Sequence, residues 1–300
     1  MINTEINIAG VTWKNPVTVS SGTFGSGMEF DEYVDINKLG AVTTKGVADK
    51  PWAGNPTPRI AEVYGGMLNA VGLQNPGIET FCSRDLPFLQ KKDTRIIVNV
   101  CGHTLEEYLN VVDRLADEKV DLLEINVSCP NVKEGGIAFG VDPHALNEVT
   151  KEVKKHAKQP IIMKLSPNVT DIAEMARAAV DGGADALSLI NTLTGMKIDI
   201  ERRKFVLANK TGGLSGPAVK PIAVRMVYQV AHAVDVPIIG MGGIQTAEDA
   251  IEFIMAGATA VSVGTANFYR PNVTEEVVEG IRNYMERHHI ESLDEIRKCL

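Results

Sequence analysis

Eight short apolar or β-branched runs recur along the chain, and they limit its possible folds more than any other feature of the sequence. They lie at residues 17–20, 41–44, 95–100, 121–126, 161–165, 185–190, 237–240 and 259–263. Their apolar residues are nearly continuous instead of alternating with polar ones, which is typical of parallel strands buried on both faces. The sequence therefore predicts a parallel α/β protein with eight strands.

Helical patterns separate these runs. Leu105, Leu109 and Val112 repeat at helical spacing, and Thr104 with Glu107 predicts a capping box in front of them. Similar spacings or capping pairs predict helices that begin near Ile172, Val219, Ala247, Asn272 and Ser292. Eight strand–helix repeats with right-handed crossovers close most naturally into a (β/α)8 TIM barrel.

An open doubly wound sheet is the competing fold, but the glycine-rich turn that it needs is absent. Segment 21–27 contains glycines at spacings other than Gly-x-Gly-x-x-Gly. Residues 4–18 alternate polar and apolar around Gly10 and predict an N-terminal β-hairpin. Neither a linker nor a shift in composition divides the chain, so we expect a single barrel domain over residues 1–300.

Two connections, residues 46–77 and 191–216, are much longer than ordinary loops in a compact domain. Loops beyond about 12–15 residues are usually lids or binding loops. Both follow predicted strands, so we expect both at the carboxyl-terminal face of the barrel, where they would cover a substrate.

The fourth predicted strand ends at a thiol. Pro130 cannot donate to a sheet, so the strand stops there and leaves Asn126, Ser128, Cys129 and Asn131 around its carboxyl end. In barrels of this type that end carries the chemistry. A lone cysteine is nevertheless more often buried and inert. The interpretation of Cys129 as a reactive thiol therefore depends on evidence from other motifs of the chain.

Two lysines interrupt or end apolar strands. Lys45 ends the second run, and Lys164 lies in the middle of residues 161–165. A buried ammonium group is costly unless anions or acceptors meet it, so both are candidates to contact a ligand. The alternative for Lys164 is a side chain that extends to solvent from the strand end.

Asparagines are a third recurring feature of the strand ends and the loops behind them. The set is Asn69, Asn99, Asn126, Asn131 and Asn191. A single asparagine at such a position is more often a turn residue. Several at successive strand ends could line one mouth and offer paired hydrogen-bond donors and acceptors to a ligand.

Glycines after the last two predicted strands indicate a phosphate site. Gly242 and Gly243 follow the seventh strand, and Gly264 with Thr265 follows the eighth. Backbone N–H groups and helix N-termini at this place commonly bind phosphate in (β/α)8 barrels. Gly216 is expected to close over the same group. This pattern is shared by many sugar-phosphate barrels, so it indicates phosphate and not a particular cofactor.

Charge and cysteine usage argue against several other functions. The net charge of −8 and the pI near 5.4 argue against a nucleic-acid partner. No apolar stretch approaches the ~18 residues of a membrane span, and no signal peptide is recognisable. The cysteines Cys82, Cys101, Cys129 and Cys299 have no metal-ligand or cluster spacing, so we expect no metal site and a cytoplasmic location.

Taken together, the motifs resemble those of dihydroorotate dehydrogenases over about residues 5–285. They are Thr44-Lys-Gly46, residues 67–77 (Met-Leu-Asn-Ala-Val-Gly-Leu-Gln-Asn-Pro-Gly), Asn126-Val-Ser-Cys-Pro-Asn131, Gly240-Met-Gly-Gly243 and Gly264-Thr265. The membrane-linked branch of this family carries serine at the position of Cys129. In this respect the chain resembles the soluble branch, which carries cysteine. Residues 135–140 (Gly-Gly-Ile-Ala-Phe-Gly) are similar to the B-type catalytic subunit.

This resemblance implies an FMN-dependent oxidoreductase that converts dihydroorotate to orotate in pyrimidine biosynthesis. It implies that Cys129 is the base that removes the C5 proton while the C6 hydride passes to N5 of FMN. It places the substrate against Lys45, Asn69, Ala70, Val71, Gly72, Leu73, Asn126, Asn191 and Thr192. It places FMN against Ser21, Lys45, Gly46, Asn99, Asn126, Lys164, Ile190, Gly216, Gly242, Gly243, Gly264 and Thr265.

The B-type resemblance further implies electron transfer to NAD through a partner subunit that carries FAD and a [2Fe-2S] cluster. A homodimer of catalytic chains within a heterotetramer is the expected assembly. The alternatives are a stand-alone A-type enzyme that uses fumarate and a related barrel that acts on other dihydropyrimidines. From a different class, a phosphate-binding isomerase or synthase barrel without flavin also fits the glycine pattern.

Overall fold

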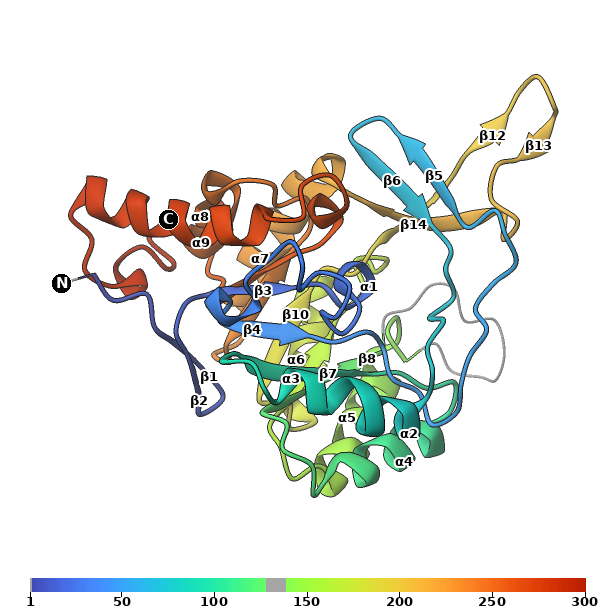
Figure 1. The fold of residues 1–300 in the computed structure, drawn as a ribbon, viewed down its shortest axis with the longest axis horizontal. Coiled ribbons are helices and arrows are strands. Elements are labelled where there is room, and N and C mark those ends of the chain that lie inside the picture. The colour runs from blue at the N-terminus through green and yellow to red at the C-terminus, as the bar shows by residue number, and fades with distance from the viewer. Residues whose placement is uncertain (1, 128–138) are drawn as a thin grey trace.

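The chain forms a barrel of eight parallel strands surrounded by helices (Figure 1). The computed structural model describes residues 2–127 and 139–300. The barrel strands are β3 (Val17–Val19), β4 (Ala41–Thr43), β7 (Arg95–Val100), β8 (Leu122–Asn126), β9 (Ile161–Lys164), β10 (Ala186–Leu189), β15 (Ile238–Met241) and β16 (Ala260–Val263). Each predicted apolar run overlaps one of these strands, so the predicted fold class is confirmed.

The strands follow the order expected of a barrel, with β3 and β4 nearly closing the ring. The hydrogen-bonded order is β3-β16-β15-β10-β9-β8-β7-β4. Between β3 and β4, the N–H of Gly40 donates to the carbonyl of Val17 at 3.0 Å. The hydroxyls of Thr18 and Thr43 lie 3.2 Å apart. All eight strands therefore point the same way and bring their carboxyl ends to one mouth.

Helices alternate with the strands from β4 onward. The longer ones are α4 (Leu105–Leu115), α5 (Pro143–His156), α6 (Ile172–Asp181), α7 (Lys220–Ala231), α8 (Ala247–Met255) and α9 (Val273–His288). A continuous helical run made of α2 (Ile78–Thr80), the π-helical η2 (Phe81–Asp85) and α3 (Leu86–Leu89) precedes β7. Short 3-10 helices in the later part of the chain are η3 (Pro217–Val219), η4 (Thr265–Phe268) and η5 (Leu293–Glu295).

The first repeat departs from the predicted strand–helix alternation. Between β3 and β4 the chain forms only α1 (Ser21–Phe24) and the 3-10 helix η1 (Ile36–Lys38). The ring of helices therefore has no full-length helix at this repeat. Part of the gap is filled by aromatic packing, because the rings of Phe24 and Phe30 stack with their centroids 4.3 Å apart.

The predicted caps have mixed outcomes. Thr104 accepts from the N–H of Glu107 at 3.3 Å, but the Glu107 carboxylate accepts from His103 instead of completing the box. Helix α9 begins directly after Asn272, as predicted, but the side chain of Asn272 makes no capping hydrogen bond. The box of Ser292 with Glu295 is present, and it starts a single 3-10 turn, η5.

The predicted N-terminal hairpin is confirmed as β1 (Ile6–Ile8) paired with β2 (Val11–Trp13). Its apolar face carries Ile8 and Trp13, which are fully buried in the main core. Asn3 pairs with Ser292, so the first residues lie beside the end of the chain. Figure 1 shows both termini on the side of the barrel away from β5 and β6.

The two long connections form a second, antiparallel sheet that the sequence did not predict. Its strands are β5 (Ile60–Val63), β6 (Gly66–Asn69), β11 (Leu193–Met196) and β14 (Thr211–Ser215), in the order β11-β14-β6-β5. A small hairpin, β12 (Ile198–Asp199) with β13 (Lys204–Phe205), extends beyond it (Figure 1). Residues 46–77 and 191–216 are therefore paired with each other instead of forming separate irregular loops.

Candidate active site

A cavity opens at the carboxyl ends of the barrel strands, beside the second sheet. It encloses about 1140 Å³ of empty space, including its open mouth. Most of the predicted site residues line it. These are Ser21, Lys45, Asn69, Val71, Gly72, Leu73, Asn126, Lys164, Ile190, Asn191, Thr192, Gly216, Gly242, Gly243, Gly264 and Thr265. The fold thus brings together segments that are far apart in the sequence, while the ligand contacts of each residue stay predictions.

Four predicted site residues have other positions. Cys129, like its neighbours Ser128 and Asn131, lies outside the described residues. Ala70 is buried, and its carbonyl accepts from Asn55. Gly46 packs against Asn99 behind the cavity wall, so closely that a Cβ on Gly46 would lie 3.0 Å from Oδ1 of Asn99.

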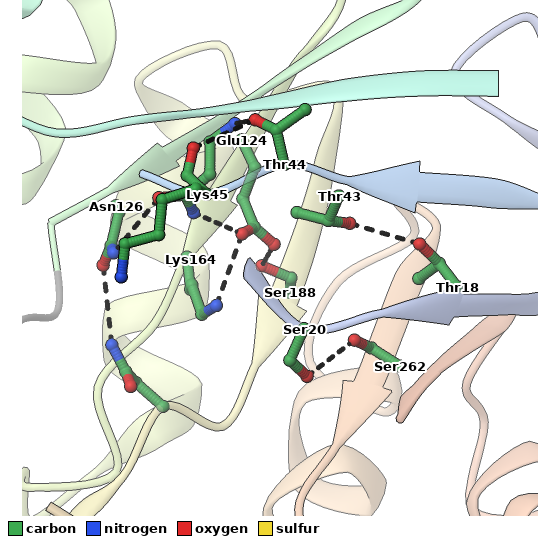
Figure 2. Close-up of polar contacts among 12 residues, drawn as sticks. Thr18, Ser20, Thr43, Thr44, Lys45, Glu124, Asn126, Lys164, Ser188 and Ser262 are labelled. Atoms are coloured by element: carbon green, nitrogen blue, oxygen red, sulfur yellow. Dashed lines mark hydrogen bonds and ion pairs between the residues drawn. The ribbon is translucent and has the colours of Figure 1, made fainter. Parts of the chain in front are cut away.

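A buried ion pair lies at the floor of the cavity (Figure 2). Nζ of Lys164 on β9 is 3.3 Å from Oε1 of Glu124 on β8. Lys164 is 4% exposed and Glu124 only 1%, so neither side chain extends to solvent. Lys164 lines the cavity, and its ammonium group is paired with the Glu124 carboxylate. Such pairing is expected because burying an unpaired charge is costly.

Glu124 was missed by the sequence analysis, although it organises several predicted residues. Its Oε1 also accepts from Nδ2 of Asn99 at 2.6 Å, and its Oε2 accepts from Oγ of Ser188 at 2.7 Å (Figure 2). Charged residues are almost never fully buried unless they are paired. A glutamate between Leu123 and Ile125, inside the predicted strand at 121–126, was therefore a signal that could have revealed this network.

The asparagine side chains form a connected series from the floor toward the rim. Nδ2 of Asn126 donates to Asn99 at 3.4 Å, and Nδ2 of Asn191 donates to Asn126 at 3.5 Å. The carbonyl of Asn126 accepts from the hydroxyl of Tyr108 at 2.8 Å, which fixes the end of β8. Asn69, from β6, donates to a backbone carbonyl of β14 at 3.4 Å. Amide groups therefore reach the cavity from the barrel and from the second sheet.

Hydroxyl pairs beside the cavity were also missed. The hydroxyls of Ser20 and Ser262 lie 2.9 Å apart (Figure 2), and Oγ1 of Thr265 donates to Oγ of Ser215 at 2.7 Å. Ser20 and Ser215 line the cavity directly. Each precedes a predicted residue by one position, so the motifs located the segment and only the fold showed which hydroxyls face inward.

Several glycines contribute to one part of the cavity lining. Gly216 has φ 104° and Gly243 has φ 83°, values that side-chain-bearing residues rarely adopt. A Cβ on Gly216 would lie 2.6 Å from Cα of Gly66, and a Cβ on Gly243 would lie 2.8 Å from the carbonyl oxygen of Gly216. These contacts leave no space for side chains at the two positions, so a ligand in the cavity meets main-chain groups there, which suits a phosphate.

Gly216→Ala is expected to destabilise the protein by about 1–3 kcal/mol, because residues other than glycine are strained at this backbone conformation. The added methyl would also push β6 and β14 apart at Gly66. Thermal unfolding of the ligand-free protein measures this effect. Gly22→Ala is the control, because Gly22 lines the same cavity and a Cβ there meets nothing within 4 Å. Equal melting temperatures for the two variants would contradict the prediction.

An ion-pair cluster joins the two helices behind the glycine end. Nζ of Lys220, at the start of α7, is 2.7 Å from both Asp249 and Glu252 of α8. The hydrogen bonds that Lys220 donates to these two carboxylates raise the pKa of its ammonium group. Burial opposes ionisation of Asp249, but hydrogen bonds from Lys220 and from the N–H groups of Gln245 and Thr246 outweigh it and lower the pKa of this carboxyl group.

Asp249→Asn is expected to lower the unfolding free energy at pH 7 by about 1 kcal/mol, the usual cost of losing a helix-capping interaction. The folded-state pKa of Asp249 lies below its unfolded value of about 3.9, so its stabilisation is complete above that pH and is lost as the pH falls further. The variant should therefore show a weaker loss of stability below about pH 4. Denaturant unfolding between pH 2 and 7 measures this, with the more exposed Glu252→Gln as control. An acid profile identical to that of the parent protein would refute it.

Two further observations concern the described residues only. Within residues 2–127 and 139–300, no group of three or more His, Cys, Asp or Glu side chains is arranged to hold a metal ion. In the same part of the chain, no helix is both long enough and apolar enough to cross a membrane.

The fold and the cavity define a (β/α)8-barrel protein with a lysine- and amide-lined ligand site at the carboxyl ends of its strands. A sequence model described as dihydroorotate dehydrogenase matches residues 3–285. The chain belongs to the dihydroorotate dehydrogenase family, which makes it an oxidoreductase.

Full-length relatives define the branch. The chain is 68% identical over 299 residues to the "Dihydroorotate dehydrogenase B (NAD(+)), catalytic subunit" of Lachnoclostridium phytofermentans, with 100% of both chains covered. It is 65% identical to the protein of the same name from Alkaliphilus metalliredigens, with 100% of this chain and 99% of the relative covered. The resemblance to B-type catalytic subunits is thus confirmed.

A solved structure supports the fold. It is a dihydroorotate dehydrogenase from Eimeria tenella in complex with ferulenol, with a TM-score of 0.80 and 24% identity. The alignment covers 98% of this chain and 88% of that chain. At this identity the likeness shows the barrel architecture alone.

Proposed function

We propose that the chain oxidises dihydroorotate to orotate with FMN bound in the barrel mouth, as the catalytic subunit of a B-type enzyme. The observation that carries this proposal is the cavity itself. It combines a buried lysine, a series of asparagines and a glycine-lined end in one space. The names of the full-length relatives support the same reaction.

The residues present fit FMN. The backbone around Gly216, Gly242, Gly243, Gly264 and Thr265 would hold the phosphate, because side chains are excluded from its closest approaches. Lys164, which is buried and lines the same cavity, would place a positive charge near the redox-active ring. When bound, FMN supplies an acceptor for two electrons. Ser21, Lys45, Gly46, Asn99, Asn126 and Ile190 complete the proposed cofactor site.

Substrate recognition is assigned to groups that converge from two directions. Asn126 reaches the cavity from the barrel, whereas Asn69 belongs to β6 of the second sheet. Asn191 and Thr192 lie between β10 and β11, and residues 70–73 follow β6. We assign the pyrimidine ring to these amides, its carboxylate to the backbone of residues 70–73, and a further contact to Lys45. The second sheet would then hold substrate over the floor and exclude water.

Cys129 is proposed as the base that removes the C5 proton. It lies outside the described residues, two positions after Val127, which follows β8. A general base must come within hydrogen-bond reach of the proton that it removes. The support for this role is its place after a barrel strand whose last residue, Asn126, lines the cavity.

The electron acceptor is proposed to be NAD, reached through a second subunit that carries FAD and a [2Fe-2S] cluster. The printed name of the relatives, a catalytic subunit linked to NAD, supports such a partner. A heterotetramer built on a homodimer of catalytic chains, located in the cytoplasm, is the proposed assembly. Residues 1–300 are proposed to act as one FMN-binding domain. The A-type alternative predicts that the single chain turns over with fumarate.

The test is a steady-state assay of the purified chain with dihydroorotate against NAD, fumarate and an artificial dye. We expect a yellow protein that reduces the dye or oxygen and reduces NAD only after the partner subunit is added. Rapid NAD reduction by the chain alone would overturn the need for a partner, and rapid fumarate turnover would favour the A-type enzyme. A colourless protein that binds no FMN would favour the isomerase alternative.

A further inference from the structure

Glu124 is a buried carboxylate that lies just outside the cavity and contacts the cation that lines it. Its side chain is 2% exposed, and Lys164, its partner at 3.3 Å, is 5% exposed at the side chain. Lys164 belongs to the cavity lining, whereas Glu124 does not. The proposed reaction gives no role to Glu124, so the buried charge at this position needs a separate explanation.

We propose that Glu124 is a positioning residue that fixes the ammonium of Lys164 and balances its charge, and thereby sets the reduction potential of the bound flavin. This inference rests on the proposed binding of FMN. Figure 2 shows the Glu124 carboxylate in contact with Lys164, on the neighbouring strand β9, and with Ser188, on the following strand β10. β8, β9 and β10 are consecutive strands in the barrel, so the geometry of the pair is held by rigid elements.

The carboxylate uses both oxygens, which restricts how Lys164 can move. Oε1 accepts from Lys164 and from Asn99, and Oε2 accepts from Ser188. Asn99 accepts in turn from Asn126, which lines the cavity. Glu124 therefore supports two lining groups, one cationic and one neutral, from a single position.

Hydrogen bonding alone does not require a charge at this position. The carbonyl oxygen of a glutamine could accept from Lys164 and Asn99, and its NH2 group could donate to the hydroxyl of Ser188. A carboxylate adds a negative charge 3.3 Å from the ammonium in a site shielded from water, where charges act strongly. A reduced flavin carries more negative charge than an oxidised one, so a more positive floor favours reduction. By neutralising part of the field of Lys164, Glu124 keeps the flavin potential low.

A charge series tests this inference through the midpoint potential of the bound flavin, measured at pH 7 by equilibration with a reference dye. Glu124→Gln makes the floor one charge more positive and should raise the ratio of reduced to oxidised flavin at least tenfold, about 30 mV for a two-electron couple. Lys164→Gln should lower that ratio. The double variant Glu124→Gln/Lys164→Gln restores the parent net charge and should return within about threefold of the parent ratio.

Ser188→Ala is the matched control, because it removes a hydrogen bond from the same carboxylate and leaves every charge in place. In this variant the ratio of reduced to oxidised flavin should stay within about threefold of the parent ratio. If Glu124 only held the packing together, Ser188→Ala and Glu124→Gln would shift the potential alike. That result, or an unchanged potential in Glu124→Gln, would overturn the inference.

Failure of this inference can be distinguished from failure of the proposed function. A parent protein that binds no FMN overturns the proposed cofactor, whereas normal flavin content with a potential insensitive to Glu124 overturns only the positioning role. If Glu124→Gln alone does not retain flavin, the double variant is compared with Lys164→Gln. A higher potential in the double variant supports the role of Glu124, and equal potentials refute it.

Discussion

Cys129→Ser is expected to fold and to keep FMN but to lose at least about a hundredfold in turnover with dihydroorotate at pH 7. An ordinary cysteine thiol titrates near about 8.5, so a fraction is available as thiolate, whereas a serine hydroxyl is a far weaker base. A positioned general base typically contributes about 10²–10⁴-fold to a rate. The expected loss follows from removing that contribution while keeping the size of the side chain nearly the same.

The measurement is steady-state reduction of an artificial dye at several pH values, with flavin content checked by visible absorbance. Cys82→Ser is the control, because Cys82 lies in η2, away from the cavity lining, and burial raises the pKa of its thiol. The control should keep the parent rate. Parent-like turnover of Cys129→Ser at pH 7 would show that another group removes the proton.

Lys164→Ala is expected to have the second largest effect, a loss of about 3–5 kcal/mol of unfolding free energy in the flavin-free protein. The substitution leaves the Glu124 carboxylate buried without its cation, and breaking a buried pair in this way is strongly destabilising. It should also weaken FMN binding or make the flavin harder to reduce, because a positive charge is lost from the cavity lining.

Denaturant unfolding measures the stability change, and absorbance after gel filtration measures flavin retention. Lys45→Ala is the control, since Lys45 lines the same cavity but is partly exposed. Its loss of stability should be much smaller. If the two variants were equally stable and kept the parent's flavin content and reduction potential, the assigned role of Lys164 would be wrong.

The barrel could be predicted from the sequence because a strand buried on both faces leaves a simple local signal. A run such as residues 95–100 is apolar and short, and the helix that follows begins at a recognisable cap, Thr104. The first repeat broke the rule, because its connection forms only α1 and η1. Residues 25–35 carry glycines and aromatics, and their packing depends on neighbours that the local sequence does not reveal.

The second sheet could not be predicted for a different reason. β6 and β14 are short and contain glycines, so neither has a strong intrinsic preference for a strand. They become strands because they pair, with Asn69 opposite Gly213 across more than a hundred residues of intervening chain. Length alone indicated that these connections were functional, and the tertiary structure showed that they form one unit.

The sequence by itself determined the strand–helix order, the end of the barrel that carries the site and most of the residues that line it. These follow from local periodicity and from motifs placed directly after strands. Only the tertiary structure decided which polar groups meet, because partners such as Glu124 and Lys164, or Ser20 and Ser262, come from different strands. Hydrogen bonds and ion pairs depend on distances of a few ångströms, and strand register and barrel closure fix those distances.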